Sequence, residues 1–399
     1  MTYLLVALGF ALCVLAYAID KSSLSKDSFP VLAGFCFVVF YSTCGQVLVF
    51  LNGYEIYSGV QLDAINDSVR ICLTALSALV LSFLIAAMSL NRTAPTTSVA
   101  VARNHSTAMI SAVVLACITA ALAAFGLKNI GVVMLPKDMK LAQVGTMHYS
   151  LLLVWQIAYV VHLANEWKVT RTTTLCLLVF AAYCIMMSER DFVFAATAFG
   201  LLAIKKLPKL KNLSTSFITL LAASAVSLSA GRGGNFDDSL FISALSQGSN
   251  LFVNSYVYNY IAASGDYFHG KSYWDAVLST LSFGLIKGEY ALSDWLTRMY
   301  AGPNSTSGYG FSLEGEAYLN FGFTGVFVVF FCIGQLISYG VKKGDTGSML
   351  PKLVYIWTVV FLFYQVRQES LVVLKTLWLC LFVAAVIKMV SRPSQRYAH

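Results

Sequence analysis

Residues 69–90 read VRICLTALSALVLSFLIAAMSL, a long and almost wholly apolar run. As an α-helix, which rises about 1.5 Å per residue, a run of this length covers the roughly 30 Å hydrocarbon core of a bilayer. With 58% hydrophobic and 12% charged residues and a mean hydropathy of +0.72, the chain is predicted to be an all-α, polytopic membrane protein with about 11 transmembrane helices. The other ten apolar runs lie at about 3–19, 30–51, 108–125, 148–164, 173–187, 192–204, 213–230, 314–340, 353–366 and 371–391.

We expect residues 1–399 to form a single integral membrane domain, with one connection much longer than the others. This connection is the loop of residues 231–313, between the eighth and ninth spans, and loops of this length are generally functional. Residues 241–263 and 276–286 are predicted to form short amphipathic helices able to lie on the membrane surface. The loop is rich in Tyr and Trp, which fits either anchoring at the interface or stacking on sugar rings.

The Lys and Arg residues predict the orientation, because loops retained in the cytoplasm carry these residues in excess. Residues 52–68 contain no Lys or Arg, whereas residues 205–211 contain four Lys. Residues 126–147 depart from this pattern, because they contain three Lys although the topology puts them outside. We therefore expect the N-terminus and the loop of residues 231–313 outside and the C-terminus in the cytoplasm. The net charge of +8 fits contact with anionic lipid headgroups and requires no nucleic-acid partner.

The nine cysteines do not predict a disulfide scaffold, because all of them fall inside expected spans. Neither a Cys-x-x-Cys pair nor an Asp-x-Asp cluster occurs in the external loops. The sequence therefore predicts no metal site and no cofactor.

Three arginine-bearing junctions interrupt the spans on the side that the topology assigns to the outside: Ser188–Asp191, Gly231–Gly234 and Arg367–Ser370. An arginine beside the hydrocarbon is costly unless it faces a carboxylate, a phosphate or a water-filled cavity. We therefore expect Arg190, Arg232 and Arg367 to bind an anionic substrate. The alternative is local ion pairing within each hairpin, between Arg190 and Asp191 and between Arg367 and Glu369. Arg232 is flanked by glycines, but the pattern is not a nucleotide loop.

Residues 307–322, SGYGFSLEGEAYLNFG, form the second informative stretch. Ser312 is a predicted N-cap, which would put Glu314 and Glu316 in the first turn of the ninth span, where the helix dipole favours negative charge. Alternatively, one of these carboxylates is a general base for a sugar hydroxyl. His269, in the long loop, is the reserve candidate for the base. Asn320, Gly322 and Gly325 are expected on a helix that packs closely against its neighbours.

This stretch resembles a known family. Gly310-Phe311-Ser312, followed by Glu316 and then by Tyr318-Leu319-Asn320-Phe321-Gly322, is similar to the O-antigen and capsule oligosaccharide repeat-unit polymerases of the Wzy type. The earlier and later arginine turns add to the resemblance, which covers roughly residues 188–375. The first five spans match only as generic hydrophobic helices.

The resemblance implies an inverting, metal-independent, GT-C-like glycosyltransferase at the periplasmic face of a bacterial inner membrane. Its donor and acceptor would both be oligosaccharide repeat units linked to undecaprenyl diphosphate, and the growing polymer would pass to the non-reducing end of the acceptor. Arginine forks would bind the diphosphate leaving group. Under this interpretation Asp191, Glu369, Tyr309, Tyr318 and Asn320 support the site. Whether a chain-length-determining co-polymerase binds is left open.

Three alternatives remain at this level. An O-antigen ligase would share the lipid-linked donor and the arginines but would pass the glycan to lipid A core. A flippase or transporter of lipid-linked oligosaccharide would carry charges deep in its spans and broken helices in related halves. A purely structural membrane scaffold would not need the outward arginines.

Overall fold

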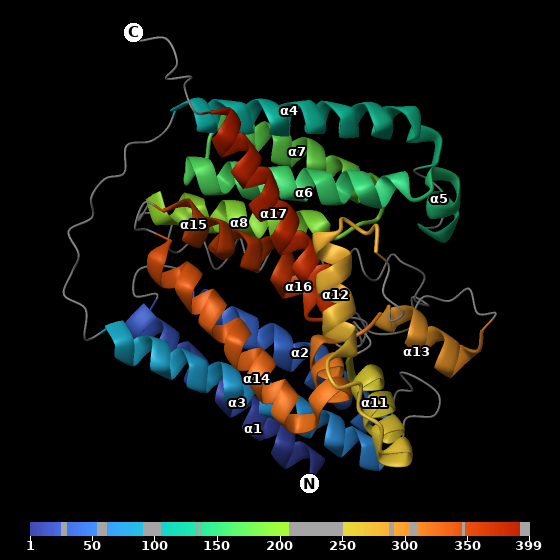
Figure 1. Cartoon of the computed structure of the whole chain (residues 1–399). Helices are drawn as coiled ribbons and strands as arrows, with labels where there is room; N and C mark the ends of the chain where they lie inside the picture. The colour runs from blue at the N-terminus through green and yellow to red at the C-terminus, as the bar shows by residue number, and fades with distance from the viewer. Residues whose placement is uncertain are drawn as a thin grey trace. The chain divides into compact units, whose positions relative to one another are not determined.

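The computed structural model describes residues 1–24, 30–53, 62–90, 105–132, 135, 137–206, 250–286, 291–303, 310–344 and 348–391. All regular secondary structure in these residues is helical (Figure 1). The pattern is that of a polytopic helical membrane protein, as the sequence predicts. Seven of the described helices are long and apolar enough to cross a membrane: Thr2–Leu24, Val31–Leu51, Ala64–Ser89, Ser106–Lys128, Met147–Glu166, Leu313–Lys343 and Ser370–Val390.

Each of these seven helices coincides with a span expected from the sequence. Three shorter apolar stretches, Arg171–Met186, Asp191–Ala203 and Met349–Gln365, coincide with three more. The remaining expected span, residues 213–230, lies outside the described residues. The count of eleven spans and the GT-C-like fold therefore stay predictions.

The chain divides into two compact units, each assembled from segments that are distant in sequence. Unit 1 comprises Met1–Thr97, Phe241–Lys342 and Phe361–Lys375. Unit 2 comprises Ser98–Leu240, Lys343–Val360 and Thr376–His399.

Unit 1 is built on three helices that pack against one another, α1 (Thr2–Ile19), α2 (Val31–Leu51) and α3 (Leu62–Leu90). Helix α11 (Asn250–Ser264) packs on α2 and α3 (Figure 1). Between lipid-embedded helices such packing stabilises through van der Waals contact and interhelical hydrogen bonds. The other elements of unit 1 are η1 (Asp20–Leu24), α12 (Lys271–Leu281), α13 (Leu292–Ala301), α14 (Leu313–Lys343), α16 (Phe363–Gln365) and the start of α17 (Ser370–Val390).

Polar contacts join the helix ends of unit 1 in a pattern that agrees with the expected alternation of spans. Thr2 Oγ1 donates to Asn66 Oδ1 at 2.7 Å, which joins the starts of α1 and α3. Where α3 and α14 end, Lys342 Nζ donates to Ser89 Oγ at 2.7 Å. The sequence assigns the first pair to the outside and the second pair to the cytoplasm. The side that each end faces stays a prediction.

Helix α14 is interrupted within the expected ninth span. Phe321 (φ −145°, ψ 18°) and Gly322 (φ 62°, ψ −154°) leave the helical region, and glycine is the residue that adopts a positive φ without strain. A Cβ at Gly325 would lie 2.5 Å from the carbonyl oxygen of Ala317, so the chain after the break passes very close to the helix before it. The prediction that Gly322 lies on a regular helix is therefore wrong.

The break has an identifiable cause in the long loop. The carbonyl oxygens of Leu319 and Asn320 accept hydrogen bonds from the backbone N–H groups of Phe268 and His269, at 3.0 and 3.2 Å. These carbonyls bond to another segment instead of continuing the helix. Non-helical backbone at this depth is tolerated where protein satisfies its polar groups.

The long loop agrees with the expected helices in part. Residues 250–263 form the predicted helix, and Leu251, Val253 and Val257 of α11 are buried, with α11 packed on α2 and α3. Residues 241–249 lie outside the described residues. The second predicted helix begins earlier, since α12 runs from Lys271 to Leu281. Helix α13, at Leu292–Ala301, was not predicted.

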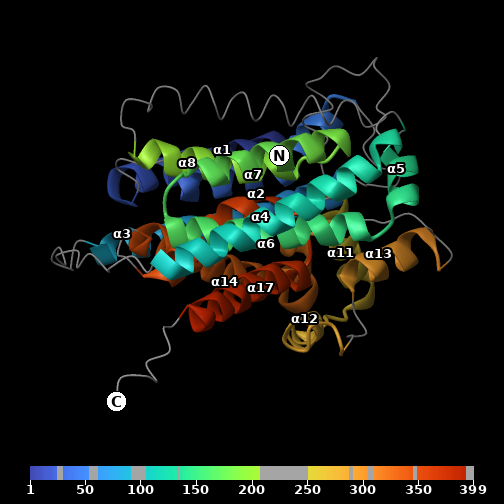
Figure 2. The same cartoon turned by 90° about the horizontal axis from the view of Figure 1, so that it is seen from above.

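Unit 2 is built on α4 (His105–Lys128), α6 (Met147–Glu166) and α7 (Arg171–Met186), with α4 packed on the other two (Figure 2). Trp155 stacks on Phe180, and its Nε1 donates to Thr119 Oγ1 at 2.9 Å. A buried indole with a hydrogen-bond partner fixes how these three helices fit together. The remaining elements of unit 2 are η2 (Ile130–Val132), α5 (Lys137–Val144), α8 (Asp191–Lys206), α15 (Met349–Trp357), most of η4 (Thr358–Leu362) and the rest of α17.

Candidate functional site

The start of α14 confirms the predicted helix cap. Ser312 Oγ accepts a hydrogen bond from the N–H of Gly315 at 2.9 Å, and the carbonyl of Ser312 accepts from the N–H of Glu316 at 2.9 Å. Glu314 and Glu316 therefore lie in the first helical turn. Both are buried, so complementing a helix dipole at a solvated end does not account for them.

Glu316 accepts three hydrogen bonds. Its Oε1 accepts from Ser272 Oγ at 2.8 Å and from Ser370 Oγ at 2.7 Å, and its Oε2 accepts from the N–H of Ser370. Ser272 lies in the first turn of α12 and Ser370 begins α17. Helix N-termini favour negative charge. The Glu316 carboxylate thus joins the starts of α12, α14 and α17.

The Arg367–Glu369 turn lies directly before α17. Glu369 accepts from the N–H of Leu292, the first residue of α13, and burial raises the pKa of Glu369. Glu369 therefore caps α13. The Nε of Arg367 is buried and has no hydrogen-bond partner among the described residues. Within the described part of the chain, Arg367 and Glu369 do not form an ion pair, so local pairing does not explain this arginine.

His269 lies on a short segment that docks on Asn320. The N–H of Gly270 donates to Asn320 Oδ1 at 2.9 Å, and Asn320 Nδ2 donates to Ser272 Oγ at 2.7 Å. His269 has a positive φ of 49° and is exposed. A general base must reach its substrate. Of the three candidate bases, His269 is exposed whereas Glu314 and Glu316 are buried.

Three tyrosines gather beside this segment. The ring centroid of Tyr318 lies 6.5 Å from that of Tyr267 and 5.9 Å from that of Tyr258, and a side-chain hydrogen bond joins Tyr318 to Tyr267. The ring of Tyr267 lies 6.4 Å from that of His269. Aromatic rings with polar edges can pack on sugar rings while their hydroxyl groups form hydrogen bonds.

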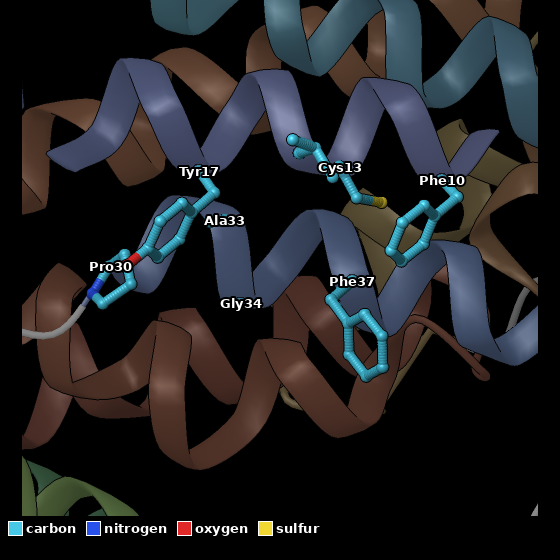
Figure 3. A pocket seen from close by; sticks show the side chains of 8 residues that line it. Phe10, Cys13, Tyr17, Pro30, Ala33, Gly34 and Phe37 are labelled. Atoms are coloured by element: carbon cyan, nitrogen blue, oxygen red, sulfur yellow. The ribbon is translucent and has the colours of Figure 1, made fainter. Parts of the chain in front are cut away.

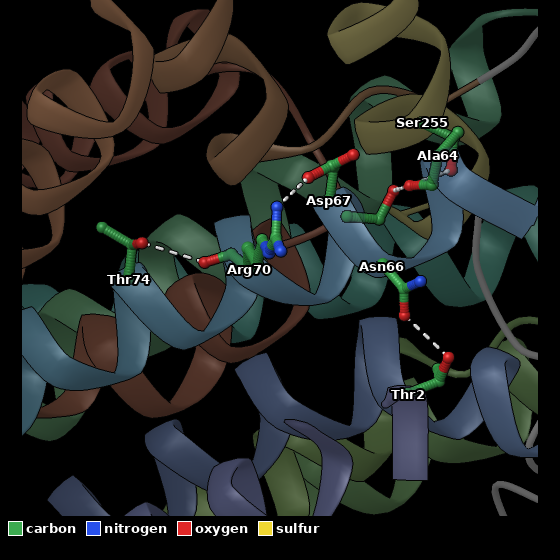
Figure 4. Close-up of polar contacts among 8 residues, drawn as sticks. Thr2, Ala64, Asn66, Asp67, Arg70, Thr74 and Ser255 are labelled. Carbon is green, nitrogen blue, oxygen red and sulfur yellow. Dashed lines mark hydrogen bonds and ion pairs between the residues drawn. The ribbon is translucent and has the colours of Figure 1, made fainter. Parts of the chain in front are cut away.

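An ion pair that the sequence analysis missed completes this cluster. Arg70 Nη1 donates to Asp67 Oδ1 at 2.8 Å, and the Arg70 side chain is 50% exposed (Figure 4). Burial, followed by the charge of the nearby Asp67, raises the pKa of Tyr258. Arg70 lies at the start of the span used to recognise the membrane fold. A charge at that position is a functional signal, and it could have been found in the sequence.

Glu314 points into a different part of unit 1. Its Oε2 accepts from Thr43 Oγ1 at 2.9 Å and from Asn254 Nδ2 at 2.7 Å, which come from α2 and α11. Its Oε1 has no N–H or O–H donor among the described residues. The two adjacent candidate carboxylates therefore have very different surroundings.

Arg190 lies in unit 2, at the turn between α7 and α8. Asp191 accepts from Gln156 Nε2 at 3.1 Å. Next to them, the buried Glu189 lies with its Oε1 3.3 Å from His148 Nε2, and Lys140 Nζ donates to the carbonyl of Met186 at 2.8 Å. These contacts brace the arginine turn from α5 and α6. His148, Glu189 and Lys140 were not predicted as site residues.

The structure thus brings Glu316, Asn320, Tyr318, His269, Arg367 and Glu369 together in unit 1 with Glu314, and places Arg190 and Asp191 in unit 2. Arg232 and Tyr309 lie outside the described residues. The shared three-arginine site therefore stays a prediction.

An apolar groove of about 350 Å³ lies apart from these residues, between α1 and α2 of unit 1 (Figure 3). Aromatic side chains line its walls and small residues its floor. The lining residues are Phe10, Cys13, Val14, Tyr17, Pro30, Ala33, Gly34 and Phe37.

Among the described residues, no group of three or more His, Cys, Asp or Glu side chains could hold a metal ion. No family model, curated protein or solved structure matches the chain. The resemblance to repeat-unit polymerases therefore rests on the sequence motifs alone.

Proposed function

We propose that the chain is a membrane glycosyltransferase that polymerises oligosaccharide repeat units linked to undecaprenyl diphosphate, at the periplasmic face of a bacterial inner membrane. One observation carries the proposal. An exposed His269 is held by Asn320 beside Tyr318 and Tyr267. A half-exposed arginine, Arg70, is paired to Asp67 near Tyr258, whose ring lies 5.9 Å from that of Tyr318. A proton acceptor, aromatic rings for a sugar and a guanidinium thus belong to one unit.

In this proposal the tyrosines bind the acceptor sugar and His269 accepts the proton of its hydroxyl group. The hydroxyl oxygen bonds to the anomeric carbon of the donor. The bond between that carbon and the diphosphate oxygen breaks, and its electron pair leaves with the diphosphate. Arg367, Arg190 and Arg232 are the proposed partners of the charge that develops there.

Glu316 has a positioning role in this scheme, because Asn320 and Ser272 link it to the His269 segment. Ser272 Oγ donates to Glu316 and accepts from Asn320, whose Oδ1 accepts from Gly270. Serving as the base itself would require the acceptor to reach Glu316, which is buried and already accepts three hydrogen bonds. This arrangement supports His269 as the base over the two carboxylates.

The break in α14 favours one competing function. Discontinuous helices are typical of transporters, where they form the substrate site, and Phe321 and Gly322 interrupt a membrane-length helix. The transporter hypothesis needs a matching break in a related half. Two π-helical stretches, Asp20–Leu24 and Thr358–Leu362, are further irregularities among the described spans, but neither contains glycine as residues 320–325 do.

The deciding experiment uses the purified chain in lipid nanodiscs with synthetic lipid-diphosphate-linked repeat units. We expect a ladder of polymer without added lipid A core. Product that forms only with lipid A core would identify a ligase. Movement of the lipid-linked substrate across vesicles without polymer would identify a transporter.

Variants then test the residue roles. His269→Gln should lower the single-turnover rate by about 10² to 10⁴-fold, whereas the matched control Asp266→Asn, an exposed residue of the same segment, should retain activity. Arg367→Lys and Arg190→Lys should lower the rate because lysine lacks the planar fork. Normal turnover in His269→Gln would return the base to Glu316 or Glu314.

A further inference from the structure

The turn of residues 188–191 in unit 2 ends α7 with a serine where glycine is usual. The N–H of Glu189 donates to the carbonyl of Cys184 at 2.7 Å, and the N–H of Ser188 donates to the carbonyl of Ile185 at 3.1 Å. These two bonds form a Schellman motif, in which glycine normally supplies the residue with a positive φ. Ser188 takes that place with a φ of 59°. A side chain in this conformation is strained, so contacts of the turn must hold it there.

Lys140 gives the serine a purpose. Its Nζ, from α5, donates to Ser188 Oγ at 3.3 Å and to the carbonyl of Met186, the last residue of α7, at 2.8 Å. Lys140 is buried. Residues 126–147 depart from the expected charge pattern of the external loops, and this contact accounts for one of their three lysines. Glycine at position 188 would lose the oxygen that the buried amine contacts.

Glu189 is held by a chain of buried side chains. Its Oε1 lies 3.3 Å from His148 Nε2, and His148 Nδ1 lies 2.8 Å from the hydroxyl of Tyr183. All three residues are buried. A carboxylate only accepts hydrogen bonds, so Nε2 of His148 carries the proton that faces Glu189. In the neutral ring Nδ1 then accepts from the Tyr183 hydroxyl, so both ring nitrogens have a partner.

These contacts fix the backbone on either side of Arg190. His148 belongs to α6 and holds residue 189. Gln156, also from α6, donates from its Nε2 to Oδ1 of Asp191, the first residue of α8, at 3.1 Å. Side chains from other helices therefore hold residues 188, 189 and 191, and the backbone of Arg190 cannot move far without breaking one of these contacts.

A simpler turn would end α7 equally well. Buried ionisable side chains are expensive in a membrane protein and usually have a function. An arginine fork binds phosphate oxygens with two parallel hydrogen bonds only when the guanidinium is correctly placed. Misplacing a binding group by about 1 Å can cost a factor of about 100 in rate. The network around residues 188–191 supplies the rigidity that such a group needs.

We propose that His148 is a positioning residue, which holds the turn through Glu189 so that Arg190 is presented to the diphosphate of the donor. This role rests on the proposed function, because the diphosphate is the group that Arg190 would bind. His148 is buried and does not itself touch the substrate. Lys140 has the same role from α5.

Two substitutions of His148 separate its two contacts. A glutamine places its amide nitrogen about where Nε2 lies, so His148→Gln can still donate to Glu189 but no longer accepts from Tyr183. An asparagine places its amide at the position of Nδ1, so His148→Asn keeps the contact with Tyr183 and loses the one with Glu189. We expect His148→Gln to retain the positioning role and His148→Asn to lose it. A residue needed only for packing would respond similarly to both changes.

Amide hydrogen exchange of the purified protein in lipid nanodiscs tests the rigidity of the turn without any substrate. The N–H groups of Ser188 and Glu189 should exchange about ten times faster in His148→Asn, because the lost hydrogen bond to a charged group shifts local opening by at least roughly that factor. Their exchange should stay close to normal in His148→Gln. Lys140→Met, which releases the turn from α5 instead, should also speed exchange, so the test does not depend on one variant folding.

His162 provides a matched control on the same helix. It is buried like His148, and its ring nitrogens lie 3.1 Å from the hydroxyl groups of Ser111 and Thr173. His162→Asn removes a comparable buried contact elsewhere in unit 2. It should therefore leave the exchange of Ser188 and Glu189 unchanged.

Single-turnover rates at low donor concentration test whether His148 acts through Arg190. The rate should fall about 10-fold in His148→Asn, the effect of roughly one charge-assisted hydrogen bond, and should remain close to normal in His148→Gln. In an Arg190→Ala background, His148→Asn should cause no further fall, because two changes that act through one group are not additive.

Two results would overturn the proposal. One is normal exchange of Ser188 and Glu189 in both His148→Asn and Lys140→Met. The other is an equal fall in rate from His148→Asn with and without Arg190. If the unaltered protein forms no polymer, the proposed function fails, and the exchange rates then decide by themselves whether His148 holds the turn.

Discussion

Ser370 donates two hydrogen bonds to Glu316, from its backbone N–H to Oε2 and from its hydroxyl to Oε1 at 2.7 Å. The two residues are 54 positions apart in sequence. Because Ser370 begins α17 and Glu316 lies in the first turn of α14, one buried carboxylate serves two helix N-termini. Glu316 therefore links the starts of α14 and α17, independently of any part in catalysis.

The hydrogen bonds to Glu316 predict that Glu316→Gln lowers the free energy of unfolding. The Gln amide keeps one acceptor oxygen in place of two, so either the N–H of Ser370 or the hydroxyls of Ser272 and Ser370 lose their acceptor. We expect a loss of about 1–3 kcal/mol, more than loss of a dipole interaction alone would give. Thermal midpoints in detergent measure it, with Asp266→Asn as the exposed control. An unchanged midpoint for Glu316→Gln would show that these bonds contribute nothing to stability.

The break in α14 predicts that its glycines are required. Gly322→Ala should cost about 1–3 kcal/mol, because its φ of 62° with a ψ of −154° lies in a region that is essentially restricted to glycine. Gly325→Ala should cost at least as much, because the new Cβ would lie 2.5 Å from a backbone carbonyl. Gly131→Ala is the control, since nothing lies within 4 Å of its Cβ position. Equal midpoints for all three variants would contradict the break in α14 and would indicate a continuous helix through Phe321.

The arrangement of charged loops predicts the orientation. A cysteine at Ser264, exposed at the end of α11, should react with an impermeant thiol reagent in cells whose outer membrane is permeable. A cysteine at Ser348, exposed before α15, should react only after the inner membrane is opened. The background should carry Cys117→Ser and Cys332→Ser, because these two native cysteines are exposed. Reversed labelling would put His269 in the cytoplasm and would contradict the proposed function.

Glu369 predicts a pH dependence of stability. Its pKa is raised above its ordinary value by burial, which outweighs the backbone hydrogen bonds from Leu292 and Ser293, and the charge of Asp294 adds to the increase. The folded state then holds this proton more tightly than the unfolded state. Stability from Glu369 is present at low pH and is lost as the pH rises from its ordinary pKa through its folded pKa.

The measurement compares the thermal midpoints of the unaltered protein and Glu369→Gln from about pH 4 to about pH 8. The stability of the unaltered protein relative to Glu369→Gln should fall as the pH rises through the pKa of Glu369 and then become constant. Asp294→Asn should reduce the change, because it removes the neighbouring charge. Parallel curves for the unaltered protein and Glu369→Gln would rule out a raised pKa at this residue.

Local features of the site could be predicted from the sequence. Ser312 was identified as the cap of α14 because a capping interaction reaches only three residues along the chain. The same reasoning placed Glu314 and Glu316 in the first turn. It did not separate them, since their partners Asn254 and Ser370 come from other helices.

Other features depended on distant segments. The sequence indicated a helix near residue 250 but did not show that α11 packs against α2 and α3. The pairing of Asp67 and Arg70 was overlooked, and its link to Tyr258 joins residues that no local pattern connects.

The sequence by itself determined that the chain is helical and suited to a membrane, because the length and apolarity of a span are properties of consecutive residues. It also determined where α14 begins. Only the tertiary structure decided that α14 breaks at Gly322 and that Glu316 and Glu314 have different hydrogen-bond partners. These outcomes depend on which donors from other helices reach each group, and that is set by packing between segments far apart in the chain.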